Sequence, residues 1–370
     1  MQEDFIMSPT PKLIKIGSAV LANEQGRLDT KVISSLVKDV ASMVKGGQPI
    51  CIVSSGAIGA GLSVLNPAKQ PRKVRKMQAL AAVGQVRLME VYQKEFSKRG
   101  LSVGQILLSH EDLAHRKSFL NTRATLEQLF SLGVVPIINE NDTVSTEEIQ
   151  FGDNDRLAVL LANVIESKEV LLLSTTDGLK DTRGDQQTIP VVGGIDSHIL
   201  SLAQGGNSLG RGGMGSKLMS IDLLNRSGKT VWLANGKTKS IIQNWAKGKE
   251  VGTRFETSHP MVSSREQWMI QHLAPKGTLH VDKGAAEALL KRRASLLPVG
   301  IKKIQGTFEP GQLLSIVHDG CEIARGMSRM GHLQVQKVLG KPKKDLLGLL
   351  PADLPHFVVH RNDLVFTDAI

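Results

Sequence analysis

Two lysines of this 370-residue chain stand in segments that could bind phosphate. Lys15 lies in KIGS (15–18), inside an otherwise apolar stretch, where a buried ammonium group is costly unless it meets an anion. Lys217 ends GRGGMGSK (210–217), and a glycine-rich turn at a helix start presents backbone N–H groups to a polyphosphate. This second segment has neither the Walker A spacing nor the preceding strand that a dinucleotide-binding glycine motif requires. Both segments indicate phosphate binding, with a surface lysine and a flexible linker as the alternatives.

Polar and acidic side chains crowd NENDT (139–143) and FGDND (151–155). Helix capping explains part of this density, because Asp153 could cap the helix that follows it. Capping does not explain the density beside an apolar strand, and carboxylates and amides can bind the ammonium and polar groups of a substrate. SSGAIGAG (54–61) also joins a strand to a helix and could hold a carboxylate or a phosphate, a plain turn being the alternative. These segments predict a substrate site.

Phosphoryl transfer fits these residue types better than hydrolysis, because the motifs contain no set of Ser, His and Asp. A carboxylate acceptor with a reference pKa of about 4.3 is ionised at neutral pH, so it needs no general base. Catalysis then consists of positioning two anions and neutralising the charge on the moving phosphoryl group. The two lysines and a Mg²⁺ ion bound to the nucleotide would supply that neutralisation.

Six short apolar runs predict the buried strands that position these segments. They cover 13–17, 50–55, 103–108, 134–139, 169–174 and 230–235. Three-to-four spacing of apolar residues predicts helices over 33–44, 74–91 and 157–164, the first of which should stop at Gly46 and Gly47. This alternation predicts a three-layer α/β/α sandwich around a mostly parallel open sheet, in which ligands bind beyond the carboxyl ends of the strands.

The pattern changes near residue 275, so we expect an α/β domain at 10–260 and a small β-rich domain at 276–360. Four extended runs and one helix are expected in the second domain. The runs cover 278–282, 306–310, 312–318 and 321–328, and the helix covers 283–293. Residues 341–355 have the pattern of an irregular connection.

The composition is that of a globular protein, with 41% hydrophobic and 22% charged residues. The formal net charge of +11 fits anionic partners such as ATP, RNA or a membrane surface, with a solubilising surface as the alternative. The part from 276 to 370 is the more basic one, with 14 Lys and Arg against 9 Asp and Glu. Cys51 and Cys321 have no metal-ligand spacing, so we expect a buried, reduced thiol at Cys51 and no structural metal.

We expect a cytoplasmic protein. No apolar run approaches the length of about 18 residues that spans a bilayer. The N-terminus is acidic and polar, without the basic region and apolar stretch of a secretory signal.

Taken together, these segments resemble the glutamate kinases of the amino-acid kinase family, followed by a PUA domain. The match runs in chain order through KIGS, SSGAIGAG, LAAVGQ, GQILLS, FLNTRATL, VVPIINENDTV, FGDNDRLAVLLA, LLLSTTDGL and GRGGMGSK. It continues through GTLHVDKGAAEALL, SLLPVGI and VVHRNDLV in the C-terminal part. The ordered set covers essentially the whole chain and is more specific than any one of its motifs.

The resemblance implies ATP-dependent phosphorylation of the γ-carboxylate of L-glutamate to L-glutamyl 5-phosphate, the first step of proline biosynthesis, with Mg²⁺ bound through the ATP phosphates. It also implies feedback inhibition by proline and a homo-oligomer, either a dimer or a tetramer. RNA binding through the PUA-like domain is a further expectation.

The resemblance also implies roles for residues at matching positions. Lys15 and Lys217 would contact the phosphates, and Asp155 would orient these lysines. The residues that would hold glutamate are Ser55, Asp142 and Asn154. The residues that would bind ATP are Lys15, Ser174, Thr175, Arg211, Gly212, Gly213, Met214, Gly215, Ser216 and Lys217.

The chain departs from the family pattern at two places in the expected nucleotide site. Ser174 and Thr175 stand where the family shows Thr-Asp, with Asp177 two places later, and Arg211 stands where the family shows threonine. These departures bear on ATP affinity and nucleotide preference.

Three other functions stay open at this point. The first is a kinase of the same fold acting on N-acetylglutamate, aspartate or carbamate. The second is an RNA-binding or RNA-modification factor, although 4% aromatic residues leave few platforms for base stacking. The third is a regulatory subunit without catalytic activity.

Overall fold

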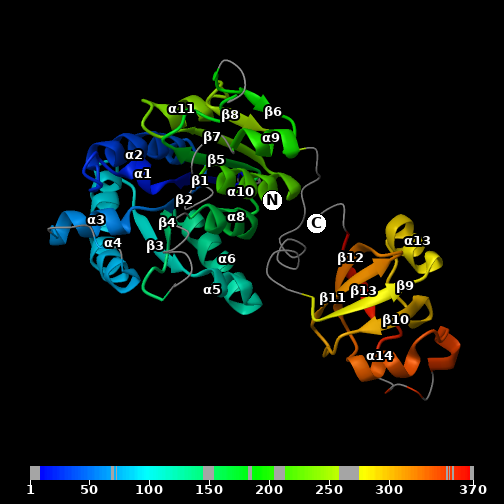
Figure 1. Cartoon of the computed structure of the whole chain (residues 1–370). Helices are drawn as coiled ribbons and strands as arrows, with labels where there is room; N and C mark the ends of the chain where they lie inside the picture. Colours follow the sequence, from blue (N-terminus) through cyan, green and yellow to red (C-terminus); the bar gives the residue numbers. More distant parts are fainter. Residues whose placement is uncertain are drawn as a thin grey trace, which may run out of the picture. The chain divides into compact units, whose positions relative to one another are not determined.

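The computed structural model describes residues 9–67, 71, 73–144, 154–181, 186–203, 213–257, 275–346, 349, 351 and 354–366. The chain separates into two compact units, Met1–Met261 and Val262–Ile370 (Figure 1). Among the helices of the described ranges, none combines the length and the apolar character needed to cross a membrane.

The first unit is built on an eight-stranded sheet with the order β3-β4-β2-β1-β5-β7-β8-β6. Six strands are parallel: β1 (Lys12–Ile16), β2 (Ile50–Ser54), β3 (Val103–Leu108), β4 (Val135–Glu140), β5 (Glu169–Ser174) and β7 (Thr230–Asn235). All six strands expected from the sequence are thereby confirmed. Two short strands were not expected. They are β8 (Thr253–Phe255), antiparallel to β7, and β6 (Val191–Val192), parallel to β8.

Helices cover both faces of this sheet, so the three-layer sandwich is confirmed (Figure 1). One layer contains α2 (Thr30–Lys45), α3 (Ala57–Leu65), α4 (Val74–Ser97) and α11 (Ile241–Ala246). The other contains α6 (Arg116–Ser131), α8 (Asp155–Val164) and α10 (Met214–Arg226). Shorter helices are α1 (Ser18–Leu21), α5 (His110–Ala114) and α9 (Ser197–Leu202).

Helix α2 ends at the glycines that the sequence predicts, and a side-chain cap that was not predicted begins it. The side chain of Asp29 accepts hydrogen bonds from the backbone N–H groups of Lys31 and Val32, which satisfies two of the free donors of the first turn. The helix stops at Gly46, and Gly47 has a φ of +85°, a conformation that glycine adopts at low cost.

The side chain of Lys15 in strand β1 lies on one particular face of the sheet. Ile14 and Ile16 are fully buried in the core that packs against α2 and α4. Because successive side chains of a strand point to opposite faces, Lys15 points to the other layer, where α8 and α10 begin. This alternation brings a cation into the interior of the unit.

Two glycines allow α3 and α4 to touch backbone to backbone. A Cβ atom at Gly84 would lie 1.8 Å from the carbonyl oxygen of Ala57, and one at Gly61 would lie 2.1 Å from that of Leu80. At such distances, a side chain at either position would push the two helices apart. The contact fixes α4 against the segment that follows β2.

The two cysteines differ in exposure. Cys51 is fully buried in the central strand β2, as expected, and burial raises the pKa of its thiol. Cys321 is exposed at the start of β12 (Cys321–Ser328), and both thiols are free.

The second unit has its own five-stranded sheet, with the order β10-β9-β11-β12-β13. Its other strands are β9 (Gly277–Val281), β10 (Ile301–Gln305), β11 (Leu313–His318) and β13 (Val359–Phe366). Its helices are α13 (Lys283–Arg292) and α14 (His332–Val338), with short turns at η2 (Pro298–Gly300) and η3 (Lys343–Leu346). A separate hydrophobic core includes Leu279, Phe308, Leu314 and Val359.

One expected strand of this unit is wrong. Residues 306–310 form a turn, in which Gly306 has a φ of +82° and Phe308 is buried in the core. The preceding strand β10 was not predicted, because Lys302 and Lys303 interrupt its apolar pattern on an edge of the sheet.

We predict that Gly84→Ala lowers the free energy of unfolding by about 1–3 kcal/mol, because the new methyl group must push α3 and α4 apart. Urea unfolding followed by circular dichroism measures the change. Val83→Ala on the exposed side of α4 is the matched control and should stay within about 0.5 kcal/mol of the natural chain. Equal stability of the two variants would contradict the backbone contact.

Candidate functional site

The expected site residues meet at one edge of the first sheet. Since the six parallel strands end at this edge, which we call the carboxyl edge, it gathers the residues that follow each strand. Lys15 lies near the end of β1, Ser55 follows β2, Glu140 ends β4 and Ser174 ends β5. Helices α8 and α10 both begin at the same place.

One carboxylate binds two lysines at this edge. Lys15 Nζ lies 2.6 Å from Asp155 Oδ1, and Lys217 Nζ lies 3.5 Å from Asp155 Oδ2. The three side chains are only 1%, 11% and 5% exposed for Lys15, Lys217 and Asp155. Because desolvation penalises an isolated ion, each lysine needs the carboxylate, and the carboxylate needs them. We call these three residues the lysine cluster.

The helix ends also favour this arrangement. Asp155 is the first residue of α8, where the helix dipole stabilises a negative charge. Lys217 lies in the first turn of α10, whose N-cap is Gly213 and whose first N–H groups receive no side-chain cap. Backbone donors and a lysine together at a helix start suit a phosphate group. The arrangement can therefore hold an anion above Asp155.

A chain of side-chain amides leads away from the lysine cluster. Asn154 Nδ2 donates to the Ser54 carbonyl oxygen at 2.9 Å and to Asn139 Oδ1 at 2.7 Å. Asn139 Nδ2 donates in turn to Gln85 Oε1 at 2.8 Å. Since Asn154 precedes Asp155 directly, these bonds tie the lysine cluster to α4. We call Asn154, Asn139 and Gln85 the amide chain.

The amide chain ends at a cavity of about 260 Å³, lined by Gln85 and by residues 140–143. Asp142 therefore lies in the same cavity as Gln85. Within the described part of the chain, Gln85 Nε2 is buried and has no hydrogen-bond partner. Glu140 is buried at the cavity wall, and His110 Nδ1 lies 3.5 Å from one of its oxygens. The cavity thus combines an unused amide donor with carboxylates.

The segment after β2 is packed tightly. Ser55 is buried, and its backbone N–H donates to the Ile16 carbonyl oxygen at 3.2 Å. Ser54 Oγ and the Tyr92 hydroxyl are 2.9 Å apart, and burial raises the pKa of Tyr92 to about 12 although this hydrogen bond lowers it in part. Tyr92 is therefore neutral at physiological pH, and it hydrogen-bonds to Ser54 at the end of β2 without adding charge.

The expected nucleotide segments lie at the same edge as far as they are described. Ser174 is half-buried at the end of β5, and Thr175 is exposed beside it. Asp177 accepts a hydrogen bond at 3.0 Å from Asn235 Nδ2 at the end of β7. Residues 213–217 open helix α10, whereas Arg211 and Gly212 lie outside the described residues, as does Asp153.

Sequence reasoning missed Gln85 as a site residue, although the segment LAAVGQ that contains it was noted. Its signal was an amide next to Gly84, the glycine that brings α4 close to α3. No described group of three or more His, Cys, Asp and Glu side chains is placed to hold a metal ion.

The sequence matches two known protein families. The amino acid kinase family pattern matches residues 11–235, and the PUA domain pattern matches residues 277–348. A glutamate 5-kinase from Pseudomonas entomophila (strain L48) is 39% identical over 359 residues, covering 95% of this chain and 96% of the relative. A glutamate 5-kinase from Marinomonas sp. (strain MWYL1) is 40% identical over the same length and with the same coverage.

The solved structure of a carbamate kinase from Giardia lamblia bound to AMP-PNP also matches, with a TM-score of 0.48 and 15% identity. The match covers 68% of this chain and 99% of that structure.

Proposed function

We infer that this chain, which belongs to the amino acid kinase family and carries a C-terminal PUA domain, transfers the γ-phosphoryl group of ATP to the γ-carboxylate of L-glutamate. The product is L-glutamyl 5-phosphate, and the reaction is the first step of proline biosynthesis. The observation that carries this proposal is the buried lysine cluster joined through the amide chain to a polar cavity.

The lysine cluster supplies the charge that phosphoryl transfer needs. Two ammonium groups and one carboxylate stand together in a nearly buried site. In such a site, fixed charges stabilise the charge of a transferring phosphoryl group more strongly than they would in water. Asp155 holds Lys15 and Lys217 in place before the substrates arrive, so little reorganisation is needed at the moment of reaction. Because the acceptor is already ionised, no proton has to be removed.

The cavity at the end of the amide chain suits an amino acid. Asp142 would bind the α-ammonium group of glutamate, and the Gln85 amide is a donor for one of its carboxylates. Asn154, the member of the amide chain next to Asp155, would hold the reacting end of the substrate, together with Ser55, which follows the Ser54 carbonyl group that accepts from Asn154. An acceptor with an acylated amine would not need the carboxylate of Asp142.

ATP would bind where β5 ends and α10 begins. Ser174 and Thr175 would contact the nucleotide, and Gly213, Met214, Gly215, Ser216 and Lys217 would surround its phosphates together with Arg211 and Gly212. Mg²⁺ would enter on the phosphates and add positive charge to the transferring group. Asp177 accepts a hydrogen bond from Asn235, so it does not simply take the place of the aspartate that the family shows where this chain has Thr175.

The substrate is tested by measuring ADP release from ATP and Mg²⁺ with glutamate, N-acetylglutamate, aspartate and carbamate. Hydroxylamine in the assay traps an acyl phosphate as its hydroxamate. We expect hydroxamate with glutamate alone, and its suppression by proline. Turnover with another acid would keep the phosphoryl chemistry and overturn the substrate, whereas turnover with none of them would overturn the proposal.

We predict that Lys217→Met lowers kcat by roughly 10²–10³-fold or more, because it removes one cation from the transition state. Steady-state kinetics at saturating ATP and glutamate measures the loss. The control is Lys247→Met, an exposed lysine at the end of α11, which should leave kcat unchanged. A near-natural kcat in Lys217→Met would refute the role of this lysine.

We predict that Asp142→Asn raises the KM for glutamate by roughly 10- to 100-fold, because a charge-assisted hydrogen bond to the ammonium group is lost. The KM for ATP should stay within about twofold, since the nucleotide lies elsewhere along the carboxyl edge. Asp319→Asn, which changes an exposed carboxylate of the second unit, is the matched control. Equal increases in both KM values would place Asp142 away from the substrate amine.

A further inference from the structure

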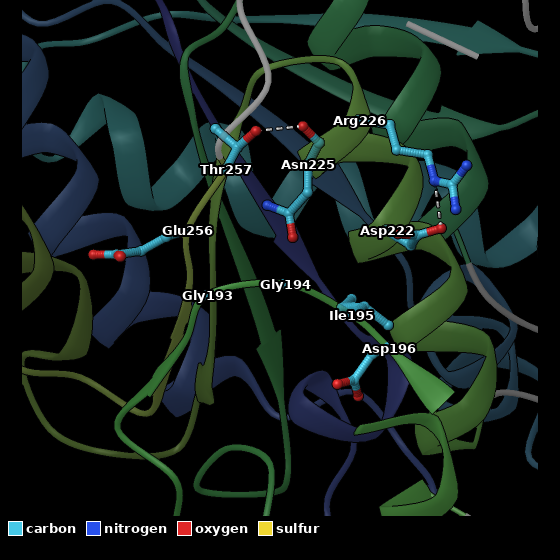
Figure 2. Close-up of a pocket in the computed structure, with 9 residues that line it drawn as sticks. All are labelled: Gly193, Gly194, Ile195, Asp196, Asp222, Asn225, Arg226, Glu256 and Thr257. Atoms are coloured by element: carbon cyan, nitrogen blue, oxygen red, sulfur yellow. Dashed lines mark hydrogen bonds and ion pairs between the residues drawn. The ribbon is translucent and has the colours of Figure 1, made fainter. Parts of the chain in front are cut away.

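Two cavities of the first unit differ in their surroundings. In a cavity of about 490 Å³ beside the last turn of α10, the carboxylates have partners within the chain. Asp222 is paired with Arg226 at 2.8 Å, as Figure 2 shows, and Glu256 is paired with Arg254 at 2.7 Å. The cavity at the end of the amide chain is instead bordered by apolar side chains that face solvent.

These apolar side chains come mainly from one side of α4. Ala79, Val83 and Val86 are four and three residues apart, so they form one stripe along the helix. All three are exposed, Val83 to 36% and Val86 to 64%. Leu107 of β3 is 38% exposed and lines the same cavity as Val86. We call Ala79, Val83, Val86 and Leu107 the α4 face.

The α4 face lies beside an edge of the first sheet. Strand β3 packs against α4 and is the terminal strand in the order of the described sheet. The outer side of an edge strand presents backbone N–H and C=O groups that can pair with another chain. A group of exposed apolar side chains is typical of a surface that binds another protein. Both features indicate an interface at this place.

Charges of opposite sign flank the apolar stripe. Lys76 and Glu90 each lie seven residues from Val83, which is about 10.5 Å along the helix axis and on the same side of the helix. Both are exposed. Arg87 contacts Glu90 at Oε2, at 3.0 Å, in a pair that is itself exposed. Such a pair contributes little, and the carboxylate can accept from a second cation through Oε1.

We propose that the α4 face binds a second copy of this chain around a two-fold axis near Val83. A two-fold interface is self-complementary, because each patch meets the same patch of the other copy. With the two α4 helices antiparallel, the apolar stripes meet at the axis. Lys76 of one copy then lies opposite Glu90 of the other copy, at both ends of the contact. These charges favour the antiparallel direction, whereas a stripe with one sign of charge would repel itself.

The second copy also covers the open side of the cavity. Ala82, Val86 and Leu107 line this cavity and are exposed, so the cavity opens on the α4 face. A docked copy lowers the access of water, and charged contacts to a ligand are stronger where water is excluded. Glutamate should therefore bind more tightly in the dimer, a consequence that rests on the proposed function.

Sedimentation velocity of the full chain tests the interface. We expect the natural chain to form an assembly with an even number of copies. Val83→Glu with Val86→Glu should reduce that number at least twofold, because it places carboxylates in an apolar contact. Val83→Ala keeps an apolar side chain at the axis and should still assemble. Leu132→Glu with Leu333→Glu changes exposed leucines outside the α4 face and is the matched control.

A monomeric natural chain would overturn the proposal. The same assembly in the natural chain and in Val83→Glu with Val86→Glu would also overturn it.

A charge exchange tests the antiparallel arrangement. Lys76→Glu and Glu90→Lys each place like charges opposite one another, so each alone should weaken the dimer at least about fivefold. The double variant Lys76→Glu with Glu90→Lys restores opposite charges and should recover the natural affinity between copies. All variants must keep the natural circular dichroism spectrum. Weakening in the double variant equal to the sum of the two single changes would overturn this arrangement.

Calorimetric titration with glutamate tests the covering of the cavity. Lys76→Glu, at a concentration where it is monomeric, is compared with the double charge variant as a dimer, since neither residue lines the cavity. We expect glutamate to bind at least about threefold more tightly to the dimer. Equal affinity would overturn the covering of the cavity. Absence of glutamate binding in both would overturn the proposed function as well, while sedimentation still decides the interface.

Discussion

The ammonium group of Lys15 is buried against one face of the sheet, and a cation buried to this degree is tolerated only beside an anion. Alternation along β1 fixes the face on which it appears, because Ile14 and Ile16 belong to the core on the other side. Asp155 must therefore begin α8 at one particular place. The same carboxylate then determines where Lys217 and the start of α10 can lie.

The amide chain extends this constraint to the cavity that Gln85 and Asp142 line. Each amide uses its two ends differently: Asn139 accepts from Asn154 and donates to Gln85. Their positions are thus coupled, and α4 is itself held by the glycine contact with α3. The charged centre and the cavity with Asp142 are therefore joined by one hydrogen-bonded network.

Much of the first unit could be predicted, because its parallel strands are short, continuously apolar runs such as 169–174, and α2 has a clear stop signal at Gly46 and Gly47. The resemblance implied that Asp155 orients Lys15 and Lys217, but the residue types alone do not give this pairing, because it joins β1 to the starts of α8 and α10, which lie far apart in sequence. Gln85 was not assigned in advance, because its role depends on a contact distant in sequence. Its oxygen accepts from Asn139, which leaves its Nε2 group as the unused donor. In the second unit, the exposed lysines of β10 concealed a strand, and the apolar Phe308 suggested one where a turn buries the ring.

The different exposure of the two thiols gives a way to measure the opening of the first sheet. Cys51 lies in β2 beside β1, with no exposed surface and a raised pKa, so reagents reach it only when the central strands separate. Cys321 is accessible in the folded second unit. Modification of Cys321 is therefore immediate, whereas the rate of modification of Cys51 measures how often the sheet that holds Lys15 comes apart.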